Sequence, residues 1–348
     1  MAQTREASSP LTPEFEGESP RIEANIDLAQ DDDNDSAIDS GSLNSSTASL
    51  SESIFDYRKL HGRTYQNTKT AEYWAPNDET QNEGLDLIHN ALLMLMDDKL
   101  FLSPIEKNPG IVLDVGTGTG IWAIDFADQY PETEVIGTDL SPIQPPWVPP
   151  NVKFMIDDCL LDWTWPENHF DFIHIRALYG SVADWGELYR KAFAHLKPGK
   201  WFENMEMGVK LQSDHVKFPE DHVFNELSSL VYEAGNITGR TFRICEGHTM
   251  KEHMEAAGFV DVVEKKIKGP LHAWPKDPKL QQAGSLLQLA FDESLEGLNM
   301  FLLTQILGWQ AEEAMLLQSK MRKESRKISN YHWFQITIVY GRKPDESE

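Results

Sequence analysis

The sequence has few cysteines and few basic residues. Its two cysteines, Cys159 and Cys245, allow one disulfide but exclude a disulfide scaffold or a cysteine-rich zinc site. Lys and Arg number 31 against 56 Asp and Glu, which gives a formal net charge of −25. Nucleic-acid-binding proteins need a basic face for the phosphates, so we expect no direct nucleic acid binding.

Long apolar runs are missing as well. The longest, ALLMLM at 91–96, is far too short to cross a bilayer. The first residues lack the basic stretch and apolar core of a secretory signal. We therefore expect a soluble intracellular protein with no transmembrane segment. With 348 residues and 40% hydrophobic content, the chain can form one or two domains with a sizeable core.

Residues 1–55 differ in composition from the rest of the chain. They hold 12 acidic residues against Arg5 and Arg21, eleven serines, and neither Trp nor Tyr. So little apolar area cannot offset the entropy lost on ordering the chain. We predict a disordered, acidic, Ser-rich tail over 1–55 and one folded domain over 56–348. The tail is either a phosphorylatable docking segment or, as its composition favours, a solvating extension.

Beyond Tyr57, segments with the period of strands alternate with segments that have the period of helices. The run at 111–116 is apolar and ends in glycine, as in a strand covered on both faces. The segment 83–100 instead places Leu85, Ile88, Leu92 and Leu95 on one helical face. Further strands are expected at 134–139, 152–157, 170–178 and, after a turn, 197–207, and helices at 120–130 and 184–196. This alternation predicts an α/β fold with a doubly wound, mostly parallel sheet.

The C-terminal part predicts more helix, followed by a closing strand. The segment 249–259 is helical, with Gly258 as its cap, and 260–267 alternates as a strand does. A longer helical region covers about 279–327, and 332–343 reads as the last strand. We expect the helices before the first strand and between the last two strands to form a lid.

The main chemical signal is the loop DVGTGTG, from Asp114 to Gly120, between a buried strand and a helix. Glycine at 116, 118 and 120 permits positive φ and a close backbone approach to a ligand. The dinucleotide pattern would require glycine at 121, where Ile121 stands, and no P-loop lysine follows. The Asp114 carboxylate would repel a pyrophosphate but not a cationic sulfonium ligand. Asp114 could accept a hydrogen bond from an amino group of that ligand, or it could fix the loop through backbone N–H groups. The alternative is that the loop is only a tight turn and binds no ligand.

Two further acidic positions follow the next strands. Asp139 ends the strand 134–139 and could accept both hydroxyls of a ribose. Asp157 and Asp158 follow the strand after it, where an adenine amino group would lie. Each of these aspartates could instead be a helix N-cap. For Asp157 and Asp158 we give the N-cap and the ligand role equal weight, whereas for Asp139 we favour the ligand role.

These residues resemble the class I S-adenosylmethionine (SAM) methyltransferases. The sequence is similar in particular to the fungal LaeA-like methyltransferases, including the VipC and VapB type proteins. The resemblance spans about 57–344 and rests on the segments 73–105, 112–154, 170–185, 195–201, 274–280, 306–309 and 339–344. Within them, DVGTGTGIWAIDFAD and GTDLSPIQPPWVPPN are specific. Lys200 departs from the family's common KPGGW.

The resemblance implies a seven-stranded class I methyltransferase sheet with an N-terminal helical cap, and SAM as the cofactor. The residues then assigned to the cofactor are Asp114, Gly116, Thr117, Gly118, Gly120, Asp139, Leu140, Asp157 and Asp158. It further implies a protein-directed regulator of fungal development and secondary metabolism in the cytoplasm and nucleus. Its partners would be velvet-type or zinc-finger regulatory proteins and a related methyltransferase.

Three alternatives to that function remain open. The first is a methyltransferase acting on a small metabolite, which an apolar pocket would favour. The second is a scaffold that binds SAM without turnover. The third, on fold alone, is an oxidoreductase. The basic cluster at 320–327 is either a nuclear import signal or, as we favour, a solvated helix face.

Candidate catalytic residues are few, because methyl transfer from a sulfonium depends largely on positioning. His174, Arg176 and Tyr179 lie at the end of the strand 170–178, where a ligand of such a sheet binds. His174 could be a general base, although a core histidine is the more usual reading. Arg176 could orient an acidic group, but we favour an ion pair with Glu203 or Glu206.

Three aromatic residues near the expected site are also of interest. Tyr73 and Trp74 could cover the cofactor or belong to the hydrophobic core, and we give the two roles equal weight. Trp122 follows the glycine loop, and we expect it to pack against the sheet.

Overall fold

The computed structural model describes residues 19–25, 57–67 and 73–347. Within these residues the chain forms one large mixed sheet, in the order β5-β4-β3-β6-β7-β10-β8, with β9 also paired to β10. The parallel strands are β3 (Ile111–Val115), β4 (Glu134–Asp139), β5 (Val152–Ile156), β6 (Phe170–Arg176) and β7 (Leu196–Met207). The antiparallel strands are β8 (Gln212–Ser213), β9 (Val260–Pro270) and β10 (His332–Arg342).

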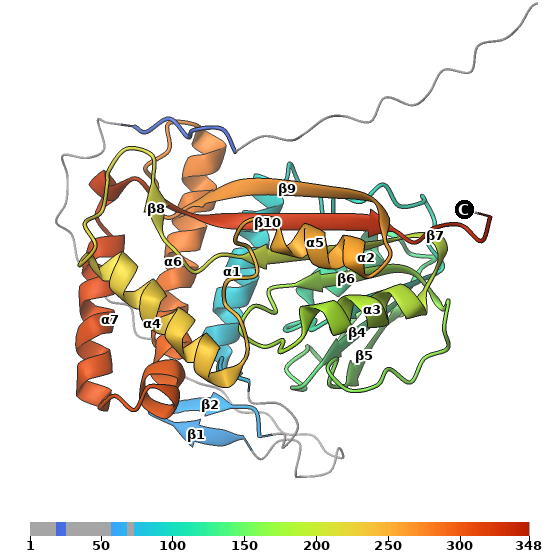
Figure 1. Cartoon of the computed structure of the whole chain (residues 1–348), viewed down its shortest axis with the longest axis horizontal. Helices are drawn as coiled ribbons and strands as arrows, with labels where there is room; N and C mark the ends of the chain where they lie inside the picture. The colour runs from blue at the N-terminus through green and yellow to red at the C-terminus, as the bar shows by residue number, and fades with distance from the viewer. Residues whose placement is uncertain (1–18, 26–56, 68–72, 348) are drawn as a thin grey trace, which may run out of the picture.

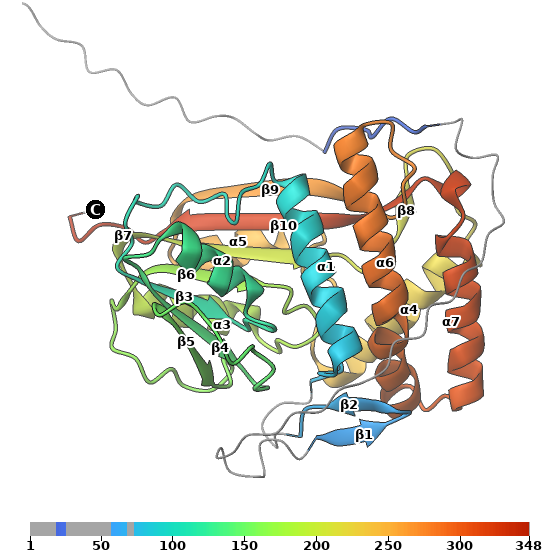
Figure 2. The same cartoon turned by 180° about the vertical axis from the view of Figure 1, so that it is seen from behind.

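The predicted doubly wound, mostly parallel α/β sheet is thus confirmed, with the two-residue β8 added to seven longer strands. Helix α2 (Ile121–Gln129) lies on one face, whereas α3 (Trp185–His195) and α5 (Thr249–Ala256) lie on the other (Figures 1 and 2). Residues 170–175 of β6 are buried on both sides, as a central parallel strand between two helical layers requires.

A layer of longer helices packs at one end of the sheet (Figure 1). It contains α1 (Glu79–Leu95), α4 (Val223–Thr238), α6 (Pro278–Phe301) and α7 (Ala311–Ser325). Helix α1 begins after its N-cap Asp78 and ends before Asp97 and Asp98, whose φ values are 57° and 59°. The helix expected at 83–100 therefore exists but ends at Leu95.

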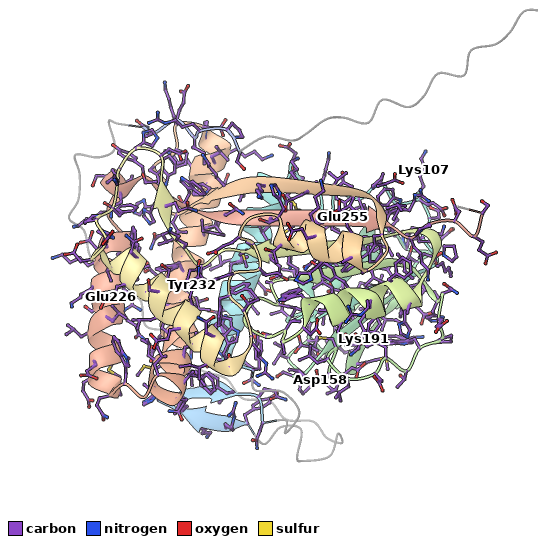
Figure 3. The ribbon with its side chains drawn as sticks, in the orientation of Figure 1. Lys107, Asp158, Lys191, Glu226, Tyr232 and Glu255 are labelled. Atoms are coloured by element: carbon purple, nitrogen blue, oxygen red, sulfur yellow. The ribbon has the colours of Figure 1, made fainter. Side chains whose placement is uncertain are left out.

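The helical region expected at 279–327 is two helices. Helix α6 continues into a π-helical turn, η3 (Leu302–Ile306), and the chain then reverses through Gly308, which has a φ of 74°. The short 3-10 turn η4 (Ile328–Asn330) follows α7. Helix α4 was not predicted from the sequence. On this helix, the ring of Tyr232 (Figure 3) is covered by the guanidinium of Arg243, which lies 3.7 Å from the ring centre.

A hairpin that was also not predicted, β1 (Arg58–Leu60) and β2 (Arg63–Tyr65), precedes α1. The Arg63 guanidinium donates two hydrogen bonds, of 2.6 and 2.7 Å, to the carboxylate of Asp78. The same carboxylate accepts from the backbone N–H of Gln81 and so caps α1. One side chain therefore fixes both the helix start and the hairpin.

Residues 19–25, which we call the N-terminal strap, correct the expectation of disorder over all of 1–55. The backbone N–H of Asn25 donates to the carbonyl of Trp274 at 2.7 Å, and that of Lys276 donates to Glu23 at 2.8 Å. Ile22 is buried in a small cluster with Trp274 and Trp333. The tail thus contributes to the folded domain here, and the rest of 1–55 lies outside the described residues.

Other sequence expectations can be settled in the described part of the chain. Cys159 and Cys245 are both free, so the disulfide that their number allowed does not form. No helix there is both long and apolar enough to span a bilayer. Lys200 forms an ion pair with Glu106 at 2.6 Å, which accounts for this unusual cation.

Candidate functional site

The glycine loop after β3 lies at the carboxyl ends of the parallel strands and opens into a pocket. Gly116, Gly118 and Gly120 all have positive φ, between 59° and 82°. A Cβ on Gly116 would lie 2.6 Å from Leu178, and one on Gly120 would lie 2.3 Å from the Phe154 ring. At Gly118 the nearest atom, on Leu85, is 3.6 Å away, so this glycine leaves room for a ligand.

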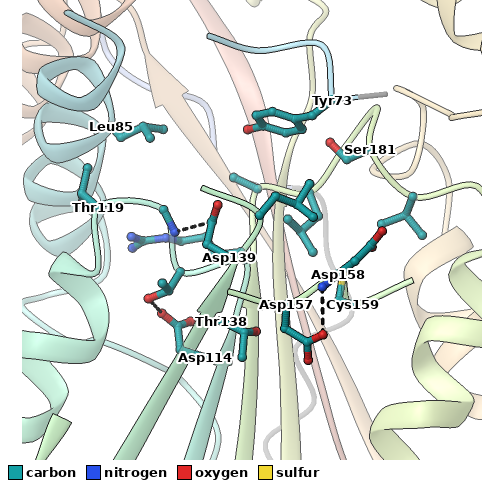
Figure 4. A pocket seen from close by; sticks show the side chains of 18 of the residues that line it. Tyr73, Leu85, Asp114, Thr119, Thr138, Asp139, Asp157, Asp158, Cys159 and Ser181 are labelled. Atoms are coloured by element: carbon teal, nitrogen blue, oxygen red, sulfur yellow. Dashed lines mark hydrogen bonds between the residues drawn. The ribbon is translucent and has the colours of Figure 1, made fainter. Parts of the chain in front are cut away.

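The pocket is lined by most of the residues that the sequence assigned to the cofactor. With its mouth it encloses about 1130 Å³. The assigned residues that line it are Asp114, Gly116, Thr117, Gly118, Asp139, Leu140, Asp157 and Asp158. Gly120 does not line it and instead packs against Phe154. Figure 4 shows Tyr73 on the opposite side of the pocket from Asp114 and Asp157.

Asp114 fixes the loop through side chains. Its Oδ2 accepts from the hydroxyl of Thr117 at 2.6 Å, and its Oδ1 is 2.7 Å from Nδ1 of His174. The carboxylate is nearly fully buried, at 3% exposure. The loop is therefore held by a hydroxyl, and not by the backbone N–H groups that the sequence suggested.

Asp139 joins the end of β4 to the glycine loop. Its Oδ2 accepts from the backbone N–H of Gly118 at 2.9 Å (Figure 4). Its Oδ1 accepts from the backbone N–H of Ser141 at 3.0 Å. Burial raises the pKa of Asp139 to about 6, against the lowering effect of these N–H groups. A cationic ligand in the pocket would favour its charged form.

Asp158 carries an acceptor that the protein leaves free. Its Oδ1 accepts from the N–H of Leu160 at 3.0 Å, whereas its Oδ2 is buried without a partner among the described residues. Asp157 accepts from the N–H of Asp158 and so orients it. Buried polar atoms are nearly always paired, so an N–H group of a ligand is the natural partner of this oxygen.

His174 is a core residue, which corrects its place among the catalytic candidates. It is fully buried, does not line the pocket, and stacks on Trp122 with ring centres 3.8 Å apart. Burial lowers its pKa despite the nearby Asp114. Trp122 in turn donates to the carbonyl of Leu100 at 2.8 Å and packs against the sheet as predicted.

Arg176 lines the pocket, but its expected ion pair is absent. Its Nη1 is 3.1 Å from Nδ1 of His89 on α1, a residue that no sequence pattern had singled out. Glu203 instead accepts from Leu102 and Ser103, and Glu206 accepts from the turn after β6. The favoured pairing of Arg176 with Glu203 or Glu206 is therefore wrong, because both carboxylates serve backbone N–H groups.

A second cavity lies beside the first, between the sheet and the helices α4, α6 and α7. It encloses about 830 Å³ with its mouth, and Ile88 and Met207 line both cavities. Of the residues that line it, Tyr179 is the one with an ionisable side chain. The members used below are Trp74, Tyr179, Leu227, Leu287, Ser294 and Asn299.

The aromatic candidates divide between the two cavities. Tyr73 lines the first, as expected for a residue that covers the cofactor, whereas Trp74 and Tyr179 line the second. Trp74 donates from Nε1 to the carbonyl of Tyr179 at 3.3 Å. The sequence indicated no second cavity, since its walls come partly from α4, which was not predicted.

The comparisons with known proteins agree with this geometry. A family model described as a methyltransferase domain matches residues 87–264. Methyltransferase pytC of Aspergillus terreus is 36% identical over 301 residues, which cover 86% of this chain and 92% of that protein. The chain belongs to the class I SAM-dependent methyltransferases. SAM is thus the cofactor of this methyltransferase.

Other similar proteins include regulators. The secondary metabolism regulator laeA of Aspergillus fumigatus is 32% identical over 308 residues, which cover 88% of this chain and 81% of that protein. Among solved structures, a phosphoethanolamine N-methyltransferase 2 of Haemonchus contortus with SAM aligns at a TM-score of 0.43 and 17% identity. That alignment covers 76% of this chain and 53% of the other.

The residues of the first cavity suit SAM. The unpartnered Oδ2 of Asp158 offers an acceptor, Gly118 leaves open space, and four aspartates face a ligand that carries a sulfonium and an ammonium group. Arg176 supplies a cation at the same pocket. When bound, SAM supplies a methyl group on a positively charged sulfur, which is already activated for displacement.

Proposed function

We propose that this methyltransferase acts on a small apolar molecule that binds in the second cavity. The observation that carries the proposal is the cavity itself, which meets the cofactor pocket at Ile88 and Met207. None of its lining residues has a carboxylate, ammonium, guanidinium or imidazole group. A lysine or arginine side chain of a protein acceptor would have to bury its charge there without a partner, at a high free-energy cost.

The cofactor would be held by side chains from four strand ends. We assign Asp139 to the ribose hydroxyls and Asp158, oriented by Asp157, to the adenine amino group. Leu140 would pack along the nucleoside. The backbone of the loop from Gly116 to Thr119, shaped by Asp114 and Thr117, would follow the methionyl part. Arg176 would face its carboxylate.

The chain's own contribution to the reaction would be positioning and the exclusion of water. Tyr179 is the one titratable residue of the second cavity, and burial raises its pKa, so it is a poor base. The acceptor must therefore be a neutral nucleophile that needs no base, such as an amine that has already lost its proton or a group with no proton to lose.

A second candidate function is that of a protein-directed regulator of fungal development and secondary metabolism. It is supported by the 32% identity to the secondary metabolism regulator laeA. It would act in the cytoplasm and nucleus with velvet-type or zinc-finger regulatory proteins and a related methyltransferase. The basic cluster at 320–327 adds little to it, because Arg322 and Arg326 lie 3.8 and 3.2 Å from the Asp292 carboxylate.

Transfer of labelled methyl from SAM in a fungal cell extract separates the two candidates. We expect the label in the solvent-extractable fraction, reduced about tenfold or more in Asp139→Ala. Asp128→Ala, a change at an exposed aspartate of α2, is the control and should leave the label unchanged. Asp139-dependent label on protein alone would favour the regulator. No Asp139-dependent label in either fraction, with SAM bound, would indicate a scaffold.

A further inference from the structure

The apolar second cavity contains one buried hydroxyl group that has no hydrogen-bond partner among the described residues. Ser294, in the middle of α6, is 3% exposed and lines the cavity. Among the described residues that line the cavity, its Oγ alone is buried without a hydrogen-bond partner. Serine in a helix usually bonds to a carbonyl one turn earlier, and exposed Ser285 of the same helix does so with Gln281 at 2.9 Å.

A glycine on the facing helix makes space for this hydroxyl. On α1, a Cβ on Gly84 would lie 2.6 Å from Ser294 Oγ, so a larger residue at this position would collide with the hydroxyl. Two other polar side chains of the cavity already donate to backbone carbonyls. Asn299 donates to the carbonyl of Leu295 at 2.7 Å, and Trp74 donates to that of Tyr179.

We propose that Ser294 determines the specificity of the second cavity by hydrogen bonding to a neutral, mainly aromatic or hydrocarbon acceptor that carries a hydroxyl or carbonyl group. The inference rests on the proposed function and names its substrate class. The ligand is neutral because no charged side chain lines the cavity to compensate an ion. It carries one polar group because a buried hydroxyl favours a ligand that satisfies it.

Two aromatic probes that differ by one hydroxyl group test the proposal. Binding of 2-naphthol and of naphthalene to the full chain is measured by equilibrium dialysis, without SAM. Ser294→Ala should weaken 2-naphthol about five- to tenfold and change naphthalene less than about twofold. Ser285→Ala, the matched control on the exposed side of α6, should change neither. Ser294→Cys gives the same comparison with a side chain of similar size if Ser294→Ala does not fold.

Three results would overturn the proposal. One is equal binding of 2-naphthol by the wild type and the Ser294 variants. Another is an equal loss of naphthalene and 2-naphthol. The third is binding of 2-naphthoate, which carries a charge, as tightly as 2-naphthol. Equilibrium dialysis of SAM with the same proteins separates a failure of the proposed function from a failure of this inference. If the chain does not bind SAM, the proposed function is contradicted. If it binds SAM but not 2-naphthol, only this inference is contradicted.

Discussion

At the scale of single residues, Glu206 holds the turn that separates the two cavities. Its carboxylate accepts from the backbone N–H groups of Leu178 and Tyr179 at 3.1 and 2.9 Å. Leu178 lines the cofactor pocket and Tyr179 lines the second cavity. Ala177, just before them, has a φ of 57°, which is costly for a residue with a Cβ. We infer that Glu206 is a positioning residue for both cavities.

The same residue predicts a dependence of stability on pH. Burial raises the pKa of Glu206 from its ordinary 4.5 to about 8, so the folded protein favours the protonated acid. Its contribution to the free energy of unfolding is complete below about pH 4.5 and is lost as the pH rises through about 8. Glu203 and Asp139, with pKa values raised to about 7 and about 6, act in the same direction.

We therefore expect the free energy of unfolding of the wild type to fall between pH 5 and 8.5, and to fall less in Glu206→Gln. Urea unfolding at several pH values measures it, and Glu220→Gln, at an exposed position, is the control. Because Glu206→Gln alters the turn between the cavities, SAM binding is measured in parallel. Parallel stability curves for the wild type and Glu206→Gln would contradict the assignment.

At the scale of elements, the loop after β3 uses its three glycines in different ways. Gly116 and Gly120 allow close packing against Leu178 and Phe154, whereas Gly118 keeps space open in the pocket. We expect Gly118→Trp to fold and to bind SAM with a Kd about tenfold or more weaker, a change of about 1.4 kcal/mol or more. Dialysis or calorimetry measures the Kd.

A matched control separates this effect from backbone strain. Gly239, at the end of α4, also has a positive φ, of 68°, with no atom within 4 Å of its Cβ position. Gly239→Trp carries the same conformational strain away from the pocket and should leave SAM binding unchanged. If Gly118→Trp bound SAM normally, the loop would not be the cofactor site.

How well the elements could be predicted depended on how local their signals are. The strands β3 and β6 are mostly apolar and almost fully buried, and the alternation of strands with helices indicates their parallel pairing. The contact between Arg176 and His89 could not be predicted, because it depends on how α1 packs across the sheet. Helix α4 did carry a local signal, with buried residues at Phe224, Leu227 and Val231 one turn apart.

At the scale of the whole molecule, the N-terminal strap connects the tail to the C-terminal part of the chain. Ile22 lies in a cluster with Trp274, Ile328 and Trp333, from segments that are distant in sequence. His215 Nε2 is also 3.0 Å from the carbonyl of Ile22. The strap therefore contacts several segments of the C-terminal part that are distant from it in sequence.

We expect Ile22→Ala to lower the free energy of unfolding by about 2 kcal/mol, near the low end for a buried aliphatic residue. Glu23→Ala is the matched control on the same strap. Its ion pair with Lys276, at 3.6 Å, is largely exposed and should contribute less than about 0.5 kcal/mol. Urea unfolding measures both. An Ile22→Ala protein as stable as the wild type would show that the strap adds nothing to the fold.

The proposed placement of cofactor and acceptor in two separate cavities has a practical consequence for enzyme engineering. Their linings share Ile88 and Met207, whereas Leu227, Leu287 and Ser294 come from helices that do not touch the cofactor pocket. Under the proposed function, a mutant library restricted to the inner faces of α4, α6 and α7 would vary the choice of acceptor and leave the residues of the cofactor pocket unchanged. Selection for new products could begin from this chain without rebuilding its donor site.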